Sequence, residues 1–261
     1  MAPIQGVFKR YEKKYLLTPE KYQEVKTAIE AHMTQDIYGL HTICNIYYDT
    51  DTYELIRASI ERPVYKEKFR VRSYGIPMTD SQVFLEIKKK FKGVVYKRRI
   101  AAPLSDAKAY LAKTDVSALP RSQILNEIDY MLDRVKPEPK VYIAYDRIAY
   151  YGNEDPNLRV TFDTNMRYRD YDLELDKGDY GKPILDEPFY LMEIKIPQVM
   201  PLWMTGILTQ YQIYPTSFSK YGTCYKKDML HKLDEKLRQR VEAYNPKETI
   251  NNEDMGDINY A

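Results

Sequence analysis

Hydrophobic and polar residues alternate with a period of two along several segments of this chain, a pattern typical of strands with one apolar face. The clearest case covers residues 65–99, where YKEKFRVRSYG, FLEIKKKFKG and VVYKRRI predict three strands. The first strand places its cations on one face: Lys66, Lys68, Arg70 and Arg72. The second adds Glu86 and Lys88 and the third adds Lys97 and Arg99, so neighbouring strands share a charged face.

The same reading predicts the other elements. Further strands are expected over residues 6–17, 41–49, 140–151, 158–165 and 190–196. A helix is expected from Thr18 and Pro19 to about Met33, because Thr is a good cap and Pro suits a first turn. Other helices are expected over 50–61, 106–112, 122–135 and 201–211, and residues 217–233 lead into the last one. The acidic segment 170–187 predicts a loop or hairpin.

Composition limits the organisation of the chain. With 261 residues and a net charge of +2, any basic site must arise from segregation of charges and not from bulk charge. Residues 1–233 are expected to form one domain with an N-terminal and a C-terminal helix. Residues 234–261 are charged and polar, which predicts a partly disordered extension.

The sequence lacks the residue patterns of several common kinds of site and segment. Two cysteines, Cys44 and Cys224, give no disulfide framework, and three scattered histidines give no metal spacing. No phosphate-loop or dinucleotide glycine pattern occurs, and no apolar run approaches a signal peptide or a membrane span. These features predict a cytoplasmic protein.

A row of cations on neighbouring strands repels itself unless water or an anion lies over it. Two arrangements satisfy this condition: an open sheet with a wet charged face, or a closed barrel with its charges turned inward around a ligand. Glu12 and Glu193 share faces with cations, and charges of both signs on one face favour the barrel. The predicted fold class is therefore α+β, a closed antiparallel β-barrel with a charged interior flanked by helices. Cations there would hold phosphate oxygens, and carboxylates would hold a divalent metal.

Seven motifs strengthen this interpretation: YEKKYLL, KFRVRSYG, LEIKKK followed by KRR, YDRIAYYG, LRVTFDTN, LMEIKI and SFSKYG. In this order, from about Gly6 to Lys227, they resemble the VTC domain of vacuolar transporter chaperone polyphosphate polymerases. That domain belongs to the triphosphate tunnel metalloenzyme (CYTH-like) superfamily. The resemblance implies a tunnel-shaped barrel, ATP and inorganic polyphosphate as ligands, and Mn²⁺ or Mg²⁺ as cofactor. It leaves a membrane-bound partner open, and nucleic acid is not expected, because the basic strands lack interleaved aromatic residues.

The resemblance also implies roles for individual residues. Glu193 would hold the metal, Lys220 would sit at the reacting phosphate, and Arg70 and Arg72 would complete the catalytic set. Phosphate or nucleotide contacts are expected from Lys14, Lys68, Arg70, Arg72, Lys88, Lys97, Arg99, Arg147, Arg159, Lys195, Ser219 and Lys220. Glu86 and Glu12 are further metal candidates, although salt bridges to adjacent lysines would also explain them. Asp163 is interpreted as a turn residue at a strand end, with a place beside a metal ligand as the alternative.

Two positions depart from the family pattern. Arg10 stands where the superfamily's hydrolases have the first Glu of Glu-x-Glu-x-Lys, which favours the polymerase branch over a two-metal hydrolase. Ser217 stands where the family has a lysine, which removes one cation. The predicted function is a polyphosphate polymerase that extends the chain with the terminal phosphate of ATP. A non-catalytic polyanion-binding module and a tunnel-type triphosphatase remain alternatives.

Overall fold

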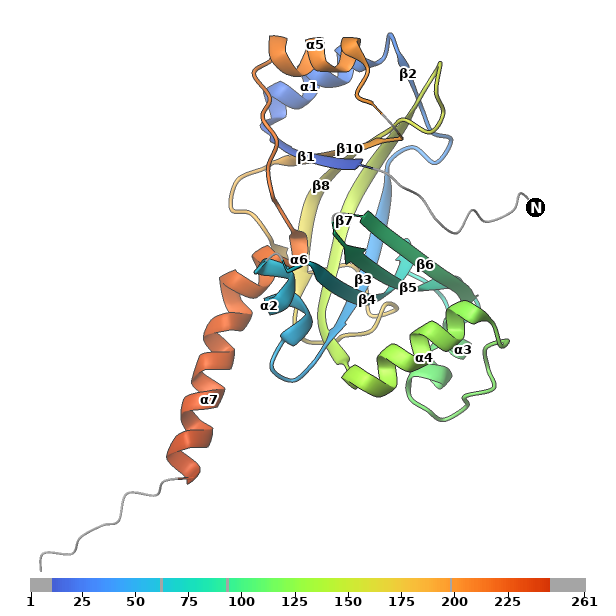
Figure 1. Ribbon diagram of the computed structural model, residues 1–261, viewed down its shortest axis with the longest axis vertical. Coiled ribbons are helices and arrows are strands. Elements are labelled where there is room, and N and C mark those ends of the chain that lie inside the picture. The colour runs from blue at the N-terminus through green and yellow to red at the C-terminus, as the bar shows by residue number, and fades with distance from the viewer. Residues whose placement is uncertain (1–10, 62, 93, 198, 245–261) are drawn as a thin grey trace, which may run out of the picture. The chain divides into compact units, whose positions relative to one another are not determined.

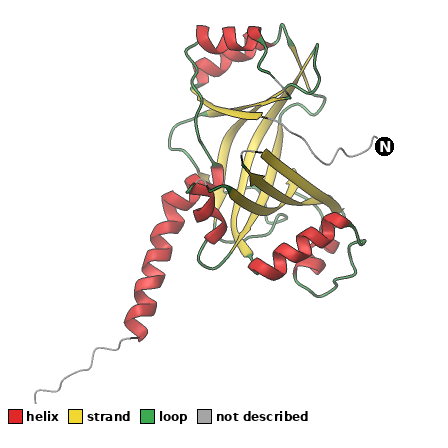
Figure 2. Cartoon of the chain, in the orientation of Figure 1, coloured by secondary structure: helices red, strands yellow, loops and turns green. Residues whose placement is uncertain are grey.

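The computed structural model describes residues 11–61, 63–92, 94–197 and 199–244. The chain forms two compact units, residues 1–224 and residues 225–261, and the first unit carries the candidate site (Figures 1 and 2). In the second unit, a π-helical turn over Tyr225–Met229 leads into α7 (Leu230–Tyr244). The helix α7 thus runs past residue 234, and the domain division predicted from composition stays a prediction.

The first unit is built on one antiparallel sheet of ten strands. The strands are β1 (Tyr11–Leu17), β2 (Met33–Gln35), β3 (His41–Asp49), β4 (Tyr65–Tyr74), β5 (Gln82–Phe91), β6 (Val94–Pro103), β7 (Glu138–Gly152), β8 (Arg159–Arg169), β9 (Lys182–Pro183) and β10 (Tyr190–Ile196). Their order is β1-β10-β8-β7-β3-β4-β5-β6, with β2 added to β7 and β9 added to β8. The predicted strands are confirmed where the structure describes them, with residues 6–10 of the first one outside the described residues, and β2 and β9 are additional.

The sheet curls but does not close. Figure 1 shows β1 and β10 above and β4, β5 and β6 turned toward the viewer, with β7 and β8 behind them. The strands β1 and β6 end the order, and no backbone pairing joins them within the described residues. The two ends approach through side chains, because Lys88 on β5 lies 3.7 Å from Glu12 on β1. The prediction of a closed barrel is therefore wrong: an ion pair, and not a hydrogen-bonded ladder, spans the gap.

Six helices belong to the first unit: α1 (Pro19–Ile29), α2 (Glu54–Ile60), α3 (Leu104–Leu111), α4 (Gln123–Val135), α5 (Leu202–Gln210) and α6 (Lys220–Cys224). The α1 helix begins as predicted, with the Thr18 side chain accepting a hydrogen bond from the Lys21 amide and Pro19 in the first turn. It ends at Ile29, earlier than predicted. Met33 is buried, but it lies in β2 opposite Gly152 and not on the helix.

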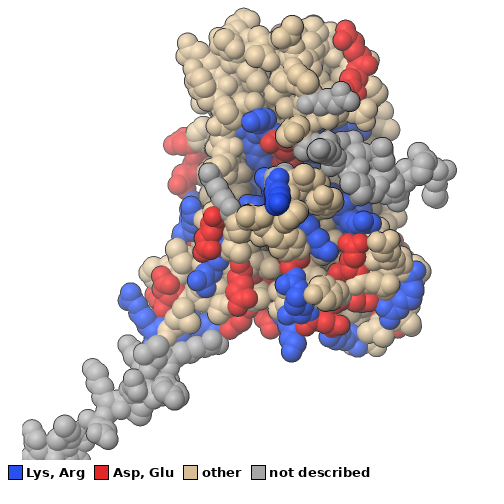
Figure 3. Space-filling model, in the orientation of Figure 1, with Lys and Arg blue, Asp and Glu red and all other residues tan. Residues whose placement is uncertain are grey.

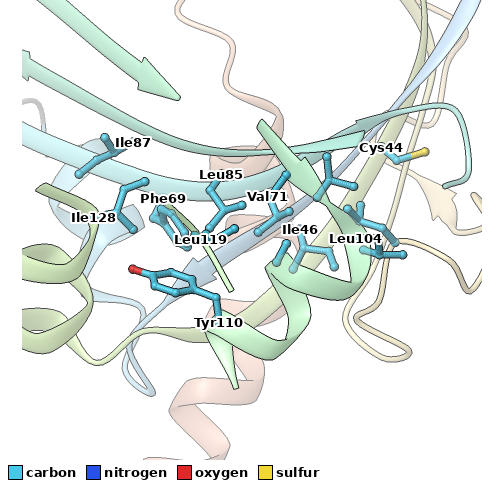
Figure 4. Close-up of a cluster of buried hydrophobic side chains, with 14 of the residues drawn as sticks. Cys44, Ile46, Phe69, Val71, Leu85, Ile87, Leu104, Tyr110, Leu119 and Ile128 are labelled. Carbon is cyan, nitrogen blue, oxygen red and sulfur yellow. The ribbon is translucent and has the colours of Figure 1, made fainter. Parts of the chain in front are cut away.

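Two apolar clusters cover the outer face of the sheet. Phe69, Val71, Leu85 and Ile87 pack under α3 and α4, and Figure 4 shows this cluster with Ile128 of α4. A second cluster joins β8 and β10 to α1 and α5 through the buried Val160, Phe162 and Ile194 among others. Each such side chain stabilises the fold by about 1.5–3 kcal/mol when fully buried. With the outer face apolar and covered, the charged side chains of the same strands are left on the inner face.

Candidate phosphate-binding site

Charged side chains of seven strands lie on the inner face of the sheet. We call this surface the charged face, formed by Glu12, Lys14, Lys68, Arg70, Arg72, Glu86, Lys88, Lys97, Arg99, Arg147, Asp163, Glu193 and Lys195. Figure 3 shows the surface over α1 and α5 largely free of charge in this view, with Lys and Arg gathered below it over the sheet. Because side chains of directly paired residues point the same way, strand pairing places most predicted site residues together.

Glu86 is the centre of one half of the charged face. It is 1% exposed and lies 2.6 Å from both the Arg70 guanidinium and the Lys97 ammonium. Burial alone would raise the pKa of Glu86, but Arg70, Arg72 and Lys97 hold that pKa well below its ordinary value. Each carboxylate oxygen thus lies within ion-pair distance of a cation, an arrangement that explains Glu86 without a metal.

Besides their ion pairs with Glu86, Arg70 and Arg72 are held by hydrogen bonds to neutral side chains. Arg70 donates to the Tyr47 hydroxyl at 2.9 Å, and Arg72 donates to Asn45 at 2.8 Å and to the Tyr145 hydroxyl at 3.0 Å. These contacts fix both guanidinium planes without neutralising them. Two fixed forks with residual positive charge suit bidentate contacts to phosphate oxygens.

The other half of the charged face is a chain of alternating charges. From α6 to β5 it runs Lys220, Asp163, Arg147, Glu193, Lys14, Glu12 and Lys88, with separations of 2.5, 2.5, 3.8, 3.0, 3.6 and 3.7 Å. Asp163 is fully buried in the middle of β8 and accepts two hydrogen bonds from Arg147 and one from Lys220. Its interpretation as a turn residue is wrong, because a buried carboxylate between two cations orients both of them.

Lys14 marks the point where a divalent cation would fit. Its ammonium lies 3.0 Å from Glu193 and 3.6 Å from Glu12, so two carboxylates already share one positive charge. Burial would raise the pKa of Glu193, but Lys14 and its neighbours hold that pKa well below its ordinary value, so the carboxylate is ionised. Among the described residues no group of three or more His, Cys, Asp or Glu could hold a metal by itself. Two carboxylates completed by ligand phosphates is, however, the usual coordination of Mg²⁺.

Three lysines stand side by side in one row of the charged face. Lys68 on β4 is directly opposite Lys88 on β5, which is directly opposite Lys97 on β6. Lys88 reaches Glu12 and Lys97 reaches Glu86, whereas Lys68 makes no ion pair with any part of the chain that the structure describes. Burial, together with Lys88 and Lys14, lowers the pKa of Lys68 to about 7. Like charges held opposite one another are costly, and an anion lying over the row would relieve that cost.

Lys220 reaches the charged face from α6. It is 9% exposed, and its ammonium lies 4.2 Å above the Tyr145 ring. The next residue, Tyr221, donates a hydrogen bond of 2.9 Å to the buried carboxylate of Asp49. Asp49 also accepts hydrogen bonds from the backbone of Thr50, Leu55 and Ile56, so it ties α6 to the start of α2. Burial raises the pKa of Asp49.

The remaining predicted residues lie at the margins. Arg99 stacks on the Phe84 ring at 4.7 Å, and Arg159 is exposed opposite Lys195 at the edge of the charged face. Ser219 precedes α6 and accepts a hydrogen bond from the Gly222 amide, so its hydroxyl is occupied within the chain. Ser217 is exposed, and Arg10 lies outside the described residues.

Sequence reasoning missed the uncharged members of the site. Asn45, Tyr47 and Tyr145 orient the arginines, and Tyr221 connects α6 to Asp49. A signal was present for two of them, because Asn45 and Tyr47 alternate on the strand predicted over residues 41–49. Nothing local indicates that this strand pairs with the basic strand β4.

A sequence model of the VTC domain matches residues 9–228, most of the chain and all of the charged face. The chain belongs to the VTC domain family. A relative of this VTC domain chain is vacuolar transporter chaperone complex subunit 4 of Schizosaccharomyces pombe, 22% identical over 267 residues. That alignment covers 83% of this chain and 37% of the relative, so the chain spans little more than a third of that protein.

Solved structures show the same fold for this VTC domain. The crystal structure of a "putative adenylate cyclase" from Bacillus halodurans aligns with a TM-score of 0.53 at 13% identity, covering 82% of this chain and 96% of that one. At this identity the likeness concerns the fold alone. Within the described residues, no helix is both long and apolar enough to cross a membrane.

Proposed function

We propose that this VTC domain is a polyphosphate polymerase. It transfers the terminal phosphoryl group of ATP to the end of an inorganic polyphosphate chain lying on the charged face. The bond between the terminal phosphorus and its bridging oxygen breaks, a new bond forms to the terminal oxygen of the chain, and ADP leaves. The main support is the lysine row of Lys68, Lys88 and Lys97 beside Arg70 and Arg72, because like charges held opposite one another are costly and a bound polyanion relieves that cost.

Phosphoryl transfer demands positioning and neutralisation of charge more than covalent help. In this proposal Arg70 and Arg72 clamp nucleotide phosphates with guanidinium planes that Tyr47, Asn45 and Tyr145 already hold in place. Binding then needs no reorganisation of these side chains.

Lys220 supplies a point charge for the transferred group, and Asp163 holds its ammonium in place at the charged face. Arg147 is fixed by the same carboxylate and adds a second cation beside it. Lys220 and Arg147 are therefore both oriented before the ligand binds, on the side of the charged face nearest α6.

Glu193 and Glu12, which share the Lys14 ammonium, would hold a divalent ion, Mn²⁺ or Mg²⁺. Such an ion would neutralise charge on the phosphate oxygens.

The test is incubation of the purified chain with ATP and Mn²⁺ or Mg²⁺, followed by gel detection of polyphosphate. Chains are expected only with divalent metal, and Glu193→Gln is expected to abolish them while Glu187→Gln, at an exposed acidic position, leaves them unchanged. Synthesis that survives Glu193→Gln would overturn the metal assignment.

Two other outcomes would replace the proposal. Retention of polyphosphate without extension at any metal concentration would identify a polyanion-binding module. Release of phosphate from ATP or tripolyphosphate without chain growth would identify a tunnel-type triphosphatase.

A further inference from the structure

The charged face ends in aromatic side chains on one side. Tyr74 follows Arg72 by two residues on β4, and Phe84 precedes Glu86 by two on β5, so both share the face of those charges. His41 lies directly opposite Arg147 on β7. We call Tyr38, His41, Tyr74 and Phe84 the aromatic rim.

The rim is both connected and accessible. The ring of His41 lies 6.1 Å from the rings of Tyr38 and Tyr74, and the Tyr74 ring meets the Phe84 ring edge-on at 5.6 Å. Tyr38 is 72% exposed and Tyr74 is 50% exposed, so much of each side chain is open to solvent. Gly75 follows Tyr74 with a φ of +76°, a turn conformation that lets the chain leave the strand directly after the ring.

The opposite end of the charged face has a different character. There the side chains are the lysine row of Lys68, Lys88 and Lys97, of which Lys97 is exposed and the other two are half-buried. The exposed aromatic residues at that end, Tyr65 and Phe91, occupy strand positions that point to the outer face. The two ends of the charged face therefore differ along the strand direction: aromatic rings lie at one end and ammonium groups at the other.

We propose that the aromatic rim is the nucleobase subsite of the charged face, an inference that rests on the proposed function. A base stacked on Tyr74 and His41 directs its phosphates along the strand toward Arg72 and then Arg70. Arg72 and Arg70 lie about 7 and 14 Å from Tyr74 at the ordinary rise of a strand. The growing phosphate chain then lies over the lysine row.

Stacking determines what this subsite recognises. Every base has a π-face, so stacking tolerates any base, and the rim is expected to accept ATP and GTP with similar affinity. It distinguishes a nucleoside triphosphate from inorganic tripolyphosphate, which has no ring. The chemical class selected at this end is thus a nucleotide and not a bare phosphate chain.

The test compares ATP with tripolyphosphate by calorimetry in the absence of divalent metal, so that no turnover occurs. Tyr74→Ala is expected to weaken ATP binding by about 5- to 100-fold, the range given by stacking of one base. Tripolyphosphate binding is expected to stay within about twofold of the wild type. Tyr65→Ala is the matched control, because Tyr65 lies on the same strand with similar exposure, 46%, but faces outward.

Each outcome decides the inference. Equal losses for ATP and tripolyphosphate, or no loss for ATP, would overturn the subsite, and Tyr74→Trp is expected to restore binding by supplying a ring. If Tyr74→Ala fails to fold, Tyr38→Ala, at a position 72% exposed, gives the same comparison. If the wild type separates ATP from tripolyphosphate through Tyr74 but makes no polyphosphate, the proposed polymerase fails while the nucleobase subsite stands.

Discussion

Lys88 on β5 lies 3.7 Å from Glu12 on β1, although β10, β8, β7, β3 and β4 separate these two strands in the sheet. This ion pair connects the two ends of the curled sheet across the charged face. Lys88 remains 42% exposed and Glu12 24% exposed, so water screens the pair and its contribution to stability is small.

Removal of the Glu12 charge should therefore strengthen phosphate binding more than it harms the fold. Glu12→Gln is expected to lower the free energy of unfolding by less than about 1 kcal/mol, as for other exposed pairs. Without metal it should tighten tripolyphosphate binding, because Lys14 and Lys88 lose a competing carboxylate. Calorimetry checks the affinity and urea unfolding checks the stability. Glu30→Gln breaks an exposed pair on α1 and serves as the control, and weaker binding by Glu12→Gln would contradict the expectation.

Glu86 should behave as a structural residue. Glu86→Gln leaves Arg70 and Lys97 without their shared carboxylate and is expected to destabilise the fold by about 2–3 kcal/mol, less than for a wholly buried pair. Urea unfolding measures this loss. The metal concentration that supports half-maximal chain synthesis should stay unchanged, and a large increase in it would instead place Glu86 among the metal ligands.

Binding of a polyanion should draw a proton onto Lys68. Its pKa is lowered to about 7, so at pH 8 Lys68 is largely neutral in the free protein, and a bound phosphate raises the pKa again. Proton uptake is therefore expected at pH 8 and not at pH 6, where the lysine is already charged. Tripolyphosphate titrations in buffers of different ionisation enthalpy measure it.

The comparison between variants isolates this lysine. Lys97 and Lys195 have pKa values lowered to about 7 and about 8, so they add to the total uptake. Lys68→Met should lose the share of the proton uptake that Lys68 contributes. Lys68→Arg should still bind tripolyphosphate but should also lack that share of the uptake. Equal uptake in the wild type and Lys68→Met would exclude the assignment.

The hydroxyl of Tyr221 should act through Lys220. Tyr221→Phe removes the bond to Asp49 but keeps the packed ring, and it is expected to lower kcat about tenfold with little change in KM, because a charge-assisted bond that fixes α6 contributes about 1.5–3 kcal/mol. In a Lys220→Ala background the same change should have no further effect on kcat. Tyr142→Phe is the control, because it removes another buried hydroxyl, one in the apolar cluster under α3 and α4. Additive losses would show that Tyr221 supports only the fold.

Much of this organisation could be predicted from local sequence. The period of two in KFRVRS and LEIKKK assigns Arg70, Arg72, Glu86 and Lys88 to one face, because alternation along a strand is fixed by backbone geometry. The structure confirms that face. The cap of α1 at Thr18 was equally local and is also confirmed.

The rest depends on pairing between distant strands. Nothing near Asp163 shows that Arg147 lies opposite it on β7 or that Lys220 approaches from α6, so a buried carboxylate between two cations looked like a turn residue. The closed barrel was wrongly predicted for the same reason. Whether the ends of a sheet join depends on the twist and length of all its strands, and no single segment encodes that.

The strand β6 ends the sheet order, and consecutive residues Lys97, Arg98 and Arg99 charge both of its faces. A strand at the edge of a sheet can template pairing with another chain, and lysine or arginine on it is a common protection. The cations of β6 thus also discourage aggregation of the free protein. A variant that neutralises Lys97 and Arg99 to study phosphate binding would at the same time bring this edge closer to self-association.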